Sequence, residues 1–177
     1  LLTLIEDIIR LSRLDEGVRG EVTPVDLTAL IQHCVQKLTP AAQNAQVSIS
    51  ASGNDPVLIS GDHALLEEML TNLLENGIKY NHAGGYVRAR AEMADGRAVV
   101  TVADNGVGIA PEDQQRVFER FYRVDKSRSK QTGGTGLGLS IVKHGAQVHH
   151  AQIAMQSALG EGTTITLTFP AQSSGKK

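Results

Sequence analysis

Apolar residues recur every three or four positions in four stretches of the sequence, which is the spacing of one buried helix face. These stretches predict helices over residues 1–14, 27–38, 63–80 and 136–149. Asp26 can cap the second helix, because its carboxylate can accept hydrogen bonds from the first free N–H groups. We expect Pro40 to end or kink this helix, since proline has no N–H to donate and its ring crowds the preceding turn.

Strand signals occupy the segments between the helices. Alternating or β-branched apolar residues predict strands over residues 21–26, 46–51, 56–60, 86–93, 97–103, 152–157 and 163–169. The dipeptide Asp95-Gly96 predicts a tight hairpin between two of them, and Pro24 confines the first strand to an edge. Residues 104–134 have only a short helical pattern around 111–121, and so long an irregular segment is typical of a functional lid.

These elements predict an α+β fold. We expect a two-layer α/β sandwich with one mixed sheet of about five strands, three helices on one face and a lid at one edge.

The composition narrows the classes of function. The 177 residues are 41% hydrophobic and carry 17 basic against 19 acidic side chains, for a net charge of -2. This is an ordinary globular composition, and without a basic excess we expect no nucleic acid partner. No apolar stretch approaches the roughly 20 residues of a membrane-spanning helix. The single cysteine, Cys34, excludes an internal disulfide and a cysteine-ligated metal cluster, and we expect it to be a small core residue in a reducing compartment.

Three short motifs could carry chemistry, and the first is Asn-Leu-Leu-Glu-Asn-Gly-Ile-Lys-Tyr at residues 72–80. On a helix, the polar residues Asn72, Asn76, Lys79 and Tyr80 would lie within about two turns on one side while the leucines face the core. An amide oxygen is a hard ligand that suits Mg²⁺, and a lysine can neutralise phosphate. The alternative interpretation is an ordinary solvated helix face.

The second motif, Asp104-Asn105-Gly106-Val107-Gly108-Ile109, directly follows a predicted strand. An ionised carboxylate only accepts hydrogen bonds, so Asp104 could select a donor such as an exocyclic amino group. The glycines would let a flat ring or a phosphate approach the backbone. An ordinary turn has the same composition and is the alternative.

The third motif, Gly133-Gly134-Thr135-Gly136-Leu137-Gly138-Leu139-Ser140, leads directly into a predicted helix. Glycines in front of a helix allow consecutive N–H groups to converge on an anion, and the helix dipole adds attraction. The motif lacks the Lys-Ser/Thr ending of a Walker loop, and it does not open the first βαβ unit as a dinucleotide fingerprint would. It predicts a phosphate-binding segment, with flexible hinge glycines as the alternative.

The segment Phe118-Glu119-Arg120-Phe121-Tyr122-Arg123 lies between the second and third motifs, and the whole series resembles the ATP-binding domain of sensor histidine kinases. The resemblance covers residues 21–170 and includes the four sequence boxes of that family. It implies the Bergerat fold, also called GHKL. Residues 121–129, the glycine motif and residues 141–144 are most similar to the phosphate-regulon sensor kinase subgroup. His149-His150 stands where most members of the family have His-Gly.

The resemblance implies ATP and Mg²⁺ as ligands, with Asn76 as the magnesium ligand. By similarity, Asn76, Lys79, Arg123 and Arg128 would perform the catalytic work. The residues that the resemblance places around the nucleotide are Asn72, Asn76, Lys79, Tyr80, Asp104, Gly106, Gly108, Ile109, Tyr122, Arg123, Lys126, Arg128, Gly134, Thr135, Gly136, Leu137, Gly138, Leu139, Thr163 and Thr164.

Individual roles follow from the same resemblance. Asp104 would bind the adenine amino group, and Thr163 or Thr164 would reach adenine through water. Gly106 and Gly108 would floor the adenine pocket. Cations of the lid would meet the β- and γ-phosphates, and the glycine motif would supply backbone N–H groups. The lid would be anchored through packing by Phe118 and Phe121.

The resemblance also divides the chain. Residues 1–16 are similar to the end of the second dimerisation helix, 17–20 would be a hinge, 21–170 the catalytic ATP-binding domain and 171–177 a disordered tail. Since the chain begins at Leu1, we expect a fragment without the phosphoacceptor histidine. None of the six histidines has the matching helix context, so each is expected at the surface or in packing. The fragment is predicted to be monomeric, to bind Mg-ATP and not to phosphorylate itself.

The implied partners are the protein's own dimerisation and phosphoacceptor domain and a cognate response regulator. The full-length protein would be a membrane-anchored homodimer with this segment as its cytoplasmic domain.

Two other functions share the fold. The ATPases of heat-shock chaperones, MutL repair proteins and type II topoisomerases carry a glutamate four residues before the magnesium asparagine, as general base for water. This chain has Asn72 at that position. An anti-sigma-factor serine kinase, or a domain that only binds nucleotide, is the other alternative.

Overall fold

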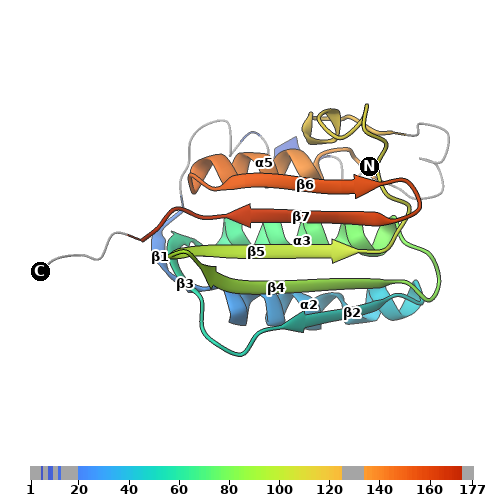
Figure 1. Ribbon diagram of the computed structural model, residues 1–177. Helices are drawn as coiled ribbons and strands as arrows, with labels where there is room; N and C mark the ends of the chain where they lie inside the picture. The colour runs from blue at the N-terminus through green and yellow to red at the C-terminus, as the bar shows by residue number, and fades with distance from the viewer. Residues whose placement is uncertain (1–4, 6–7, 10–11, 13–19, 125–133, 173–177) are drawn as a thin grey trace, which may run out of the picture.

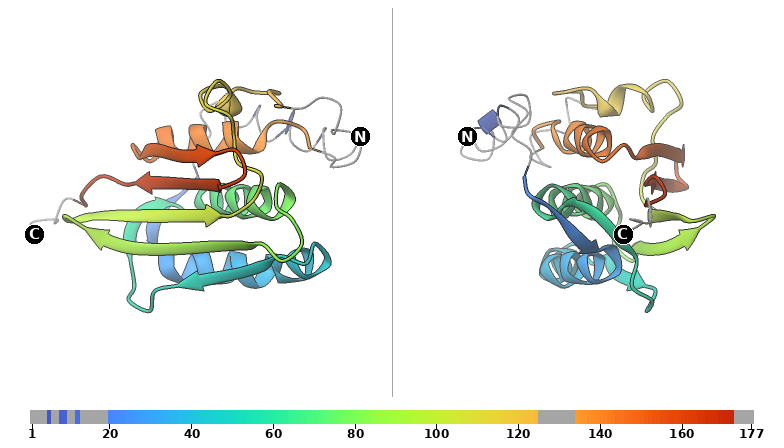
Figure 2. Two further views of the ribbon diagram at one scale, coloured as in Figure 1. Left: turned by 45° about the vertical axis from the view of Figure 1, so that its right-hand side comes forward. Right: turned by 90° about the vertical axis from the view of Figure 1, so that its left-hand side faces the viewer.

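A five-stranded sheet and three helices form two layers (Figure 1, Figure 2). The computed structural model describes residues 5, 8–9, 12, 20–124 and 134–172. Its strands follow the order β2 (Ser48–Ser52), β4 (Tyr86–Ala94), β5 (Arg97–Asp104), β7 (Gly162–Thr168) and β6 (Gln152–Ala158). Strand β2 is parallel to β4, and every other neighbouring pair is antiparallel. The predicted mixed sheet is confirmed.

One face of this sheet is covered by α2 (Leu27–Asn44), α3 (His63–Lys79) and α5 (Gly138–Val148). The right-hand view of Figure 2 shows the helices on one side and the sheet on the other. The hydrophobic core lies between the two layers. Its most deeply buried side chains include Leu27, Ile31, Leu66, Met69, Leu74, Val87, Val100, Val142, Leu167 and Phe169.

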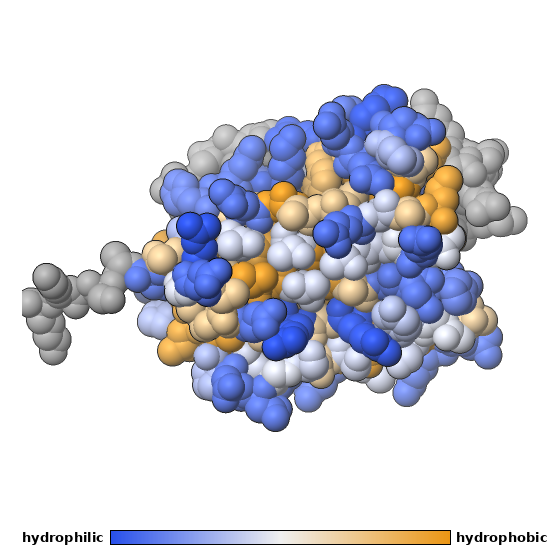
Figure 3. Space-filling view, viewed as in Figure 1, coloured by the Kyte–Doolittle hydropathy of each residue, from blue (hydrophilic) through white to orange (hydrophobic). Residues whose placement is uncertain are grey.

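The opposite face of the sheet carries mostly polar side chains. Alternation along the strands places Thr164, Thr166 and Thr168 of β7 there, with Arg88 and Arg90 of β4. Figure 3 shows this face as a mixture of polar and apolar residues.

Two of the seven predicted strands lie outside the main sheet. Strands β1 (Val22–Asp26) and β3 (Leu58–Asp62) form a separate antiparallel pair. Asp26 caps α2 as predicted, accepting hydrogen bonds from Thr28 N at 3.0 Å and Ala29 N at 3.4 Å. The same carboxylate also accepts from Val57 N at 3.2 Å, which ties this corner to the segment before β3.

Of the two outcomes expected at Pro40, an end of α2 is wrong, because the helix continues to Asn44 with the proline inside it, and a kink stays a prediction. Leu38 and Ala42 are one helical turn apart and are 7% and 0% exposed. Their burial keeps the last turn on the core even though Pro40 cannot donate a backbone hydrogen bond. The helix ends before Gln46, whose φ of 56° is left-handed.

The hairpin between β4 and β5 is confirmed. Asp95 and Gly96 have φ values of 50° and 73°, the left-handed pair that a two-residue type I′ turn requires. The helix expected around 111–121 is wrong in extent. Residues 111–115 form turns, and only the short 3₁₀ helix η1 (Arg116–Phe118) follows them.

Residues 5, 8, 9 and 12 are the described part of the predicted N-terminal helix, and all four are helical. Ile5, Ile8 and Ile9 are about half exposed. In the described part of the chain, no helix has both the length and the apolar content to cross a membrane.

Candidate functional site

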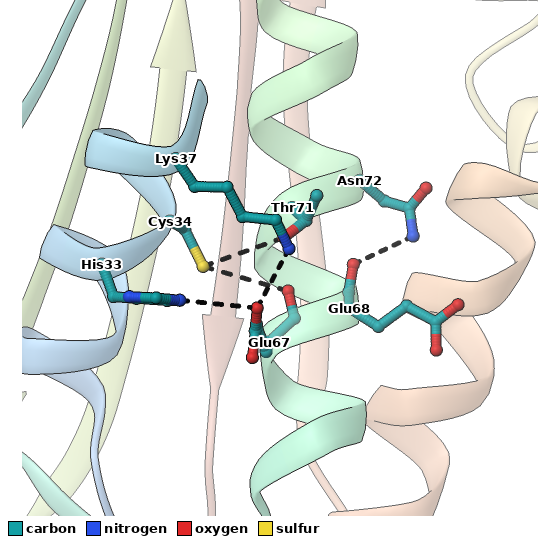
Figure 4. Close-up of polar contacts among 7 residues, drawn as sticks. All are labelled: His33, Cys34, Lys37, Glu67, Glu68, Thr71 and Asn72. Atoms are coloured by element: carbon teal, nitrogen blue, oxygen red, sulfur yellow. Dashed lines mark hydrogen bonds and ion pairs between the residues drawn. The ribbon is translucent and has the colours of Figure 1, made fainter. Parts of the chain in front are cut away.

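The first motif lies on the last turns of α3 and at its C-cap, and Asn72 faces α5. The Asn72 side-chain amide donates to the carbonyl of Glu68 at 2.9 Å (Figure 4), which leaves its oxygen directed outward. A methyl group on Gly138 would lie 2.9 Å from that oxygen, so the start of α5 is in direct contact with Asn72. Asn76 follows one turn later and is partly exposed. The structure therefore brings the first and third motifs together.

The side of α3 that faces α2 has a structural role. Glu67 accepts from Lys37 at 3.2 Å and lies 3.7 Å from His33, as Figure 4 shows. Cys34 is fully buried beside Thr71, and burial raises the pKa of its thiol. Its assignment to the core is confirmed. No group of three or more His, Cys, Asp or Glu side chains among the described residues could hold a metal ion.

Asp104 ends β5 next to α3. Its carboxylate accepts from Gly106 N at 2.8 Å, and burial raises the pKa of this group above its usual value. Gly77 of α3 permits the close approach, since a methyl group there would lie 2.9 Å from Val87 and 3.6 Å from the Asp104 Cβ. A carboxylate has about four lone-pair positions. A partly buried acceptor with lone pairs to spare therefore lies beside the helix that carries the first motif.

The two glycines of the second motif contact protein backbone. A side chain on Gly106 would collide with the Tyr80 carbonyl, and one on Gly108 with the Ala158 carbonyl. Gly108 also has a φ of 70°, which favours glycine. Close packing of the loop on these two carbonyls is therefore enough to require glycine at both positions, and the expectation that they floor an adenine pocket stays a prediction.

Strand register separates the two candidate threonines. Thr163 pairs with Asp104 and Thr164 pairs with Ala103 across β5 and β7. Val102 and Ile165 are buried and lie two positions from Asp104 and Thr163, so these two side chains face the helices. Thr164 points to the opposite face. Its proposed contact with adenine does not fit this geometry.

Ser157 completes a row that the sequence analysis missed. It pairs with Thr163 across β6 and β7, and its hydroxyl lies 2.8 Å from the Thr163 hydroxyl. Ser157 Oγ accepts from Ile109 N at 2.8 Å, and Gln114 donates to the Ile109 and Ser157 carbonyls. Serine in a strand gives no sequence signal of its own, and only the register reveals its place.

Lys79 lies where the first and third motifs meet. A methyl group on Gly134 would collide with the Lys79 ammonium, and the same ammonium lies 5.3 Å from the Tyr80 ring centre. Burial lowers the pKa of Lys79, and the positive charge of Arg123 lowers it further. A pair of cations held this close, partly desolvated, favours an anionic ligand.

The lid begins with contacts among its own residues. The Tyr122 hydroxyl donates to Asp113, which raises the pKa of the phenol, and Arg116 lies 4.2 Å from the Tyr122 ring centre. Phe121 N donates to Gly136 O at 2.9 Å, joining the lid to the glycine motif.

One lid prediction fails and two lie outside the described residues. Phe121 is 56% exposed with a φ of 64°, so it does not anchor the described part of the lid through packing. Phe118 is partly buried. Lys126 and Arg128 are not among the described residues. A hollow on the lid has three arginines and one glutamate in its lining, which consists of Arg116, Glu119, Arg120, Phe121, Tyr122, Arg123 and Val124.

The glycine motif leads into α5 as predicted. Leu137 occupies the N-cap position, and its side chain cannot cap the first N–H groups because it has no acceptor; it is instead fully buried. Leu139 is partly buried and packs against the core. Thr135 and Gly136 belong to the described approach to this helix.

A family model matches most of the chain. Residues 61–173 match the model described as "Histidine kinase-, DNA gyrase B-, and HSP90-like ATPase". This range contains all three motifs and the lid.

Individual proteins are similar over nearly the whole chain. The Sensor-like histidine kinase SenX3 of Mycolicibacterium smegmatis is 42% identical over 96% of this chain and 44% of its own length. The Phosphate regulon sensor protein PhoR of Pseudomonas aeruginosa is 38% identical over 96% of this chain and 39% of its own length. The chain therefore spans less than half the length of these two relatives.

Among solved structures, full-length ShkA in complex with AMPPNP superposes with a TM-score of 0.84 at 29% identity. The superposition covers 96% of this chain and 35% of ShkA.

Proposed function

Because the chain belongs to the histidine kinase-, DNA gyrase B- and HSP90-like ATPase family, we propose that it holds Mg-ATP for phosphoryl transfer to a histidine side chain. The acceptor histidine would lie on a dimerisation domain outside these 177 residues, and a response regulator would receive the phosphoryl group next. The whole protein would be a dimeric, membrane-anchored sensor with this segment in the cytoplasm. Its similarity to SenX3 and PhoR over 96% of the chain supports this proposal.

One observation carries the proposal: two segments distant in sequence, the end of β5 and the glycine motif, both lie against the C-terminal half of α3. Gly77 brings α3 against Asp104, Gly134 lies against Lys79, and Gly138 lies against Asn72. The carboxylate suits an amino donor at one end of this site, and the cations suit phosphate at the other.

The side chains near the phosphates fit Mg²⁺ as well. Asn76 and the outward oxygen of Asn72 are hard, neutral donors, and no cluster of acidic or imidazole ligands competes for a metal among the described residues. Phosphate oxygens would have to complete the coordination of such an ion. When bound, Mg²⁺ would offset charge on the phosphates, while Lys79 and Arg123 orient them.

The ATPase alternative is less well supported. Hydrolysis requires a base for water, and the position used by chaperone-type ATPases holds Asn72, whose amide cannot accept a proton at neutral pH. That amide is already bonded to the Glu68 carbonyl. Steady ATP turnover by this chain, lost on Asn76→Asp, would instead favour the ATPase.

Binding is tested by calorimetry with AMPPNP in the presence and absence of Mg²⁺. We expect Mg²⁺ to tighten binding to the wild type, and Asn76→Ala to remove most of that gain. Asn54→Ala is the matched control, since Asn54 is exposed in the loop before β3. Equal affinity with and without Mg²⁺ would contradict the magnesium assignment.

Transfer is tested with γ-labelled ATP. A chain extended at its N-terminus through the dimerisation domain should acquire an acid-labile, base-stable label, as phosphohistidine does, and should pass it to a response regulator. The 177-residue chain alone should stay unlabelled. Label on this chain alone, or an acid-stable label on the extended chain, would contradict the proposal.

A further inference from the structure

Ser157, Thr163 and Asp104 form one row across three strands of the sheet. Thr163 pairs with Ser157 on β6 and with Asp104 on β5, so the three side chains lie on the same face. Figure 1 shows the C-terminal ends of β5 and β6 and the start of β7 side by side. Asp104 faces the base in the proposed function and Thr163 is expected near adenine from the resemblance, whereas Ser157 has no role so far.

The Ser157 hydroxyl has three partners. It accepts from Ile109 N at 2.8 Å, donates to the Gly162 carbonyl at 2.9 Å, and lies 2.8 Å from Thr163 Oγ1. A hydroxyl has a single hydrogen to donate and two lone pairs to accept with. Three bonds of this kind use its whole capacity.

Counting hydrogens fixes the direction of the Ser157–Thr163 bond. A carbonyl can only accept, so the Gly162 oxygen must receive the Ser157 hydrogen. Thr163 can donate, and by donating to Ser157 it satisfies both hydroxyls. The reverse arrangement would withdraw the serine hydrogen from the Gly162 carbonyl and lose a partly buried hydrogen bond.

This direction determines what the Thr163 hydroxyl can offer to a ligand. Its hydrogen points toward Ser157, so only lone pairs remain for a ligand. The neighbouring Asp104 carboxylate, when ionised, also presents only lone pairs. Two adjacent groups that can only accept hydrogen bonds fit an exocyclic amino group, which has two N–H donors, and they repel an oxo group at the same position.

We infer that Ser157 is a positioning residue for base selection: it holds the Thr163 hydroxyl as an acceptor, and so favours a 6-aminopurine over a 6-oxopurine. This inference rests on the proposed function, in which Asp104 faces the base of ATP, and it places the Thr163 hydroxyl beside Asp104 at the same group of the base. Ser157 touches no ligand itself and acts through Thr163.

Ser157 also has a purely structural contact that can be separated from this role. Its backbone carbonyl accepts from the Gln114 side chain at 2.9 Å. Gln114→Ala removes this bond and leaves the Ser157 hydroxyl intact. It is therefore the matched control for a loosened loop.

The test compares the dissociation constants of ATP and ITP; ITP has an oxo group in place of the 6-amino group and a hydrogen on N1. Wild type should prefer ATP. In Ser157→Ala the Thr163 hydroxyl is free to turn and donate to the 6-oxo group, so the ITP/ATP ratio of dissociation constants should fall about fivefold, the effect of one ordinary hydrogen bond. Ser157→Thr keeps the hydroxyl and should restore the ratio. Gln114→Ala should leave it unchanged.

An unchanged ratio in Ser157→Ala, with both nucleotides weakened equally, would overturn the inference and leave the proposed function standing. A wild type that binds neither nucleotide would overturn both. If Ser157→Ala does not fold, Thr163→Val against Thr163→Ser supplies the measurement. The valine variant should lose affinity for ATP more than for ITP, and equal losses would contradict the role of the Thr163 hydroxyl.

Discussion

Thr163 lies directly opposite Asp104 in the antiparallel ladder of β5 and β7, and both side chains face the helices. The Asp104 carboxylate is partly buried there and bonded to Gly106 N through one oxygen. Burial in this position disfavours the charged form, so the pKa of Asp104 is raised above its usual value. The structure therefore holds an acceptor at a cost to folding, which is typical of a functional carboxylate.

Asp104→Asn should remove the cost in folding stability that the buried charge imposes, so that this cost can be measured apart from nucleotide binding. The folded state holds the Asp104 proton more tightly than the unfolded state does. Wild-type stability therefore declines as the pH rises through the window from 3.8 up to the raised folded pKa, and it stays reduced above that window. At pH ~7 the neutral variant should have the higher urea midpoint, and the difference should vanish near pH ~3.

The Asp104→Asn variant should also bind ATP more weakly than the wild type does. If the amide oxygen of the new side chain keeps the bond to Gly106 N, its amino group faces the base and opposes the adenine amino group. We expect ATP binding at least about tenfold weaker, roughly 1.4 kcal/mol or more, measured by calorimetry. Asp95→Asn, in the exposed hairpin, is the control and should bind as the wild type does. Unchanged ATP affinity in Asp104→Asn would contradict the assignment.

Lys79 predicts a pH dependence of nucleotide binding. Burial and then the charge of Arg123 lower its pKa below the usual 10.5, and bound phosphate would raise it again. Binding should therefore take up a proton, and affinity should fall as the pH rises through the lowered pKa of the free protein. Calorimetry in two buffers of different ionisation enthalpy, from about pH 7 to about pH 10, measures this uptake.

Two variants assign the pH dependence to Lys79. Lys79→Arg keeps its charge at every pH in this range, so the fall in affinity should flatten. Lys143→Arg alters an exposed lysine of α5 and should leave the pH profile unchanged. A profile that stays the same in Lys79→Arg would assign the titration to another group.

Glycines 108 and 96 form a matched pair that isolates the effect of close packing. Both have left-handed φ values, 70° and 73°, but a methyl group on Gly108 would collide with the Ala158 carbonyl while one on Gly96 would meet nothing within 4 Å. Gly96→Ala should lower the free energy of unfolding by about 1 kcal/mol through backbone strain alone. Gly108→Ala should lower it by roughly 3 kcal/mol or more in urea denaturation. Equal losses of unfolding free energy in the two variants would show that the loop around Gly108 shifts to accommodate the methyl group.

The spacing of apolar residues was enough to predict most of the helices and strands. Apolar residues at helical spacing predicted α2 and α3. The dipeptide Asp95-Gly96 predicted the hairpin, and both residues adopt the left-handed φ values that its turn requires. Pro40 misled the prediction because burial of Leu38 and Ala42 outweighs one lost hydrogen bond. Tertiary packing determines where α2 ends, and the residues near Pro40 alone do not predict it.

The sequence predicted the motifs of the candidate site, but it did not predict which side chains contact one another across the strands. Asn72, Lys79 and Asp104 stand out as polar residues in set positions, and the structure brings their segments together. Thr163 could be told from Thr164 only through strand register, since a shift of one residue exchanges the two faces. Ser157 was not identified from the sequence because its partners lie on two other segments of the chain, at Ile109 and at the start of β7.

His149 joins two helices and gives a last prediction. Its Nε2 accepts from Asp62 N at 3.0 Å at the start of α3, and its Nδ1 donates to the Gly145 carbonyl at 2.7 Å in α5. The ring also packs edge-on against Phe169, with centroids 6.2 Å apart. The ring therefore contacts the start of α3, the last turn of α5 and Phe169 at once. This is the packing role expected of a histidine outside the phosphoacceptor helix.

His149→Phe keeps a ring of similar size and removes both hydrogen bonds, which leaves Asp62 N–H without its acceptor. We expect a loss of about 1–3 kcal/mol in the free energy of unfolding, measured by urea denaturation. His150→Gly is the control, because His150 is exposed with a φ of 53° that glycine adopts freely. That variant should be as stable as the wild type or slightly more so. If His149→Phe unfolded at the wild-type urea midpoint, the two hydrogen bonds would contribute nothing and α5 would be held to α3 by apolar packing alone.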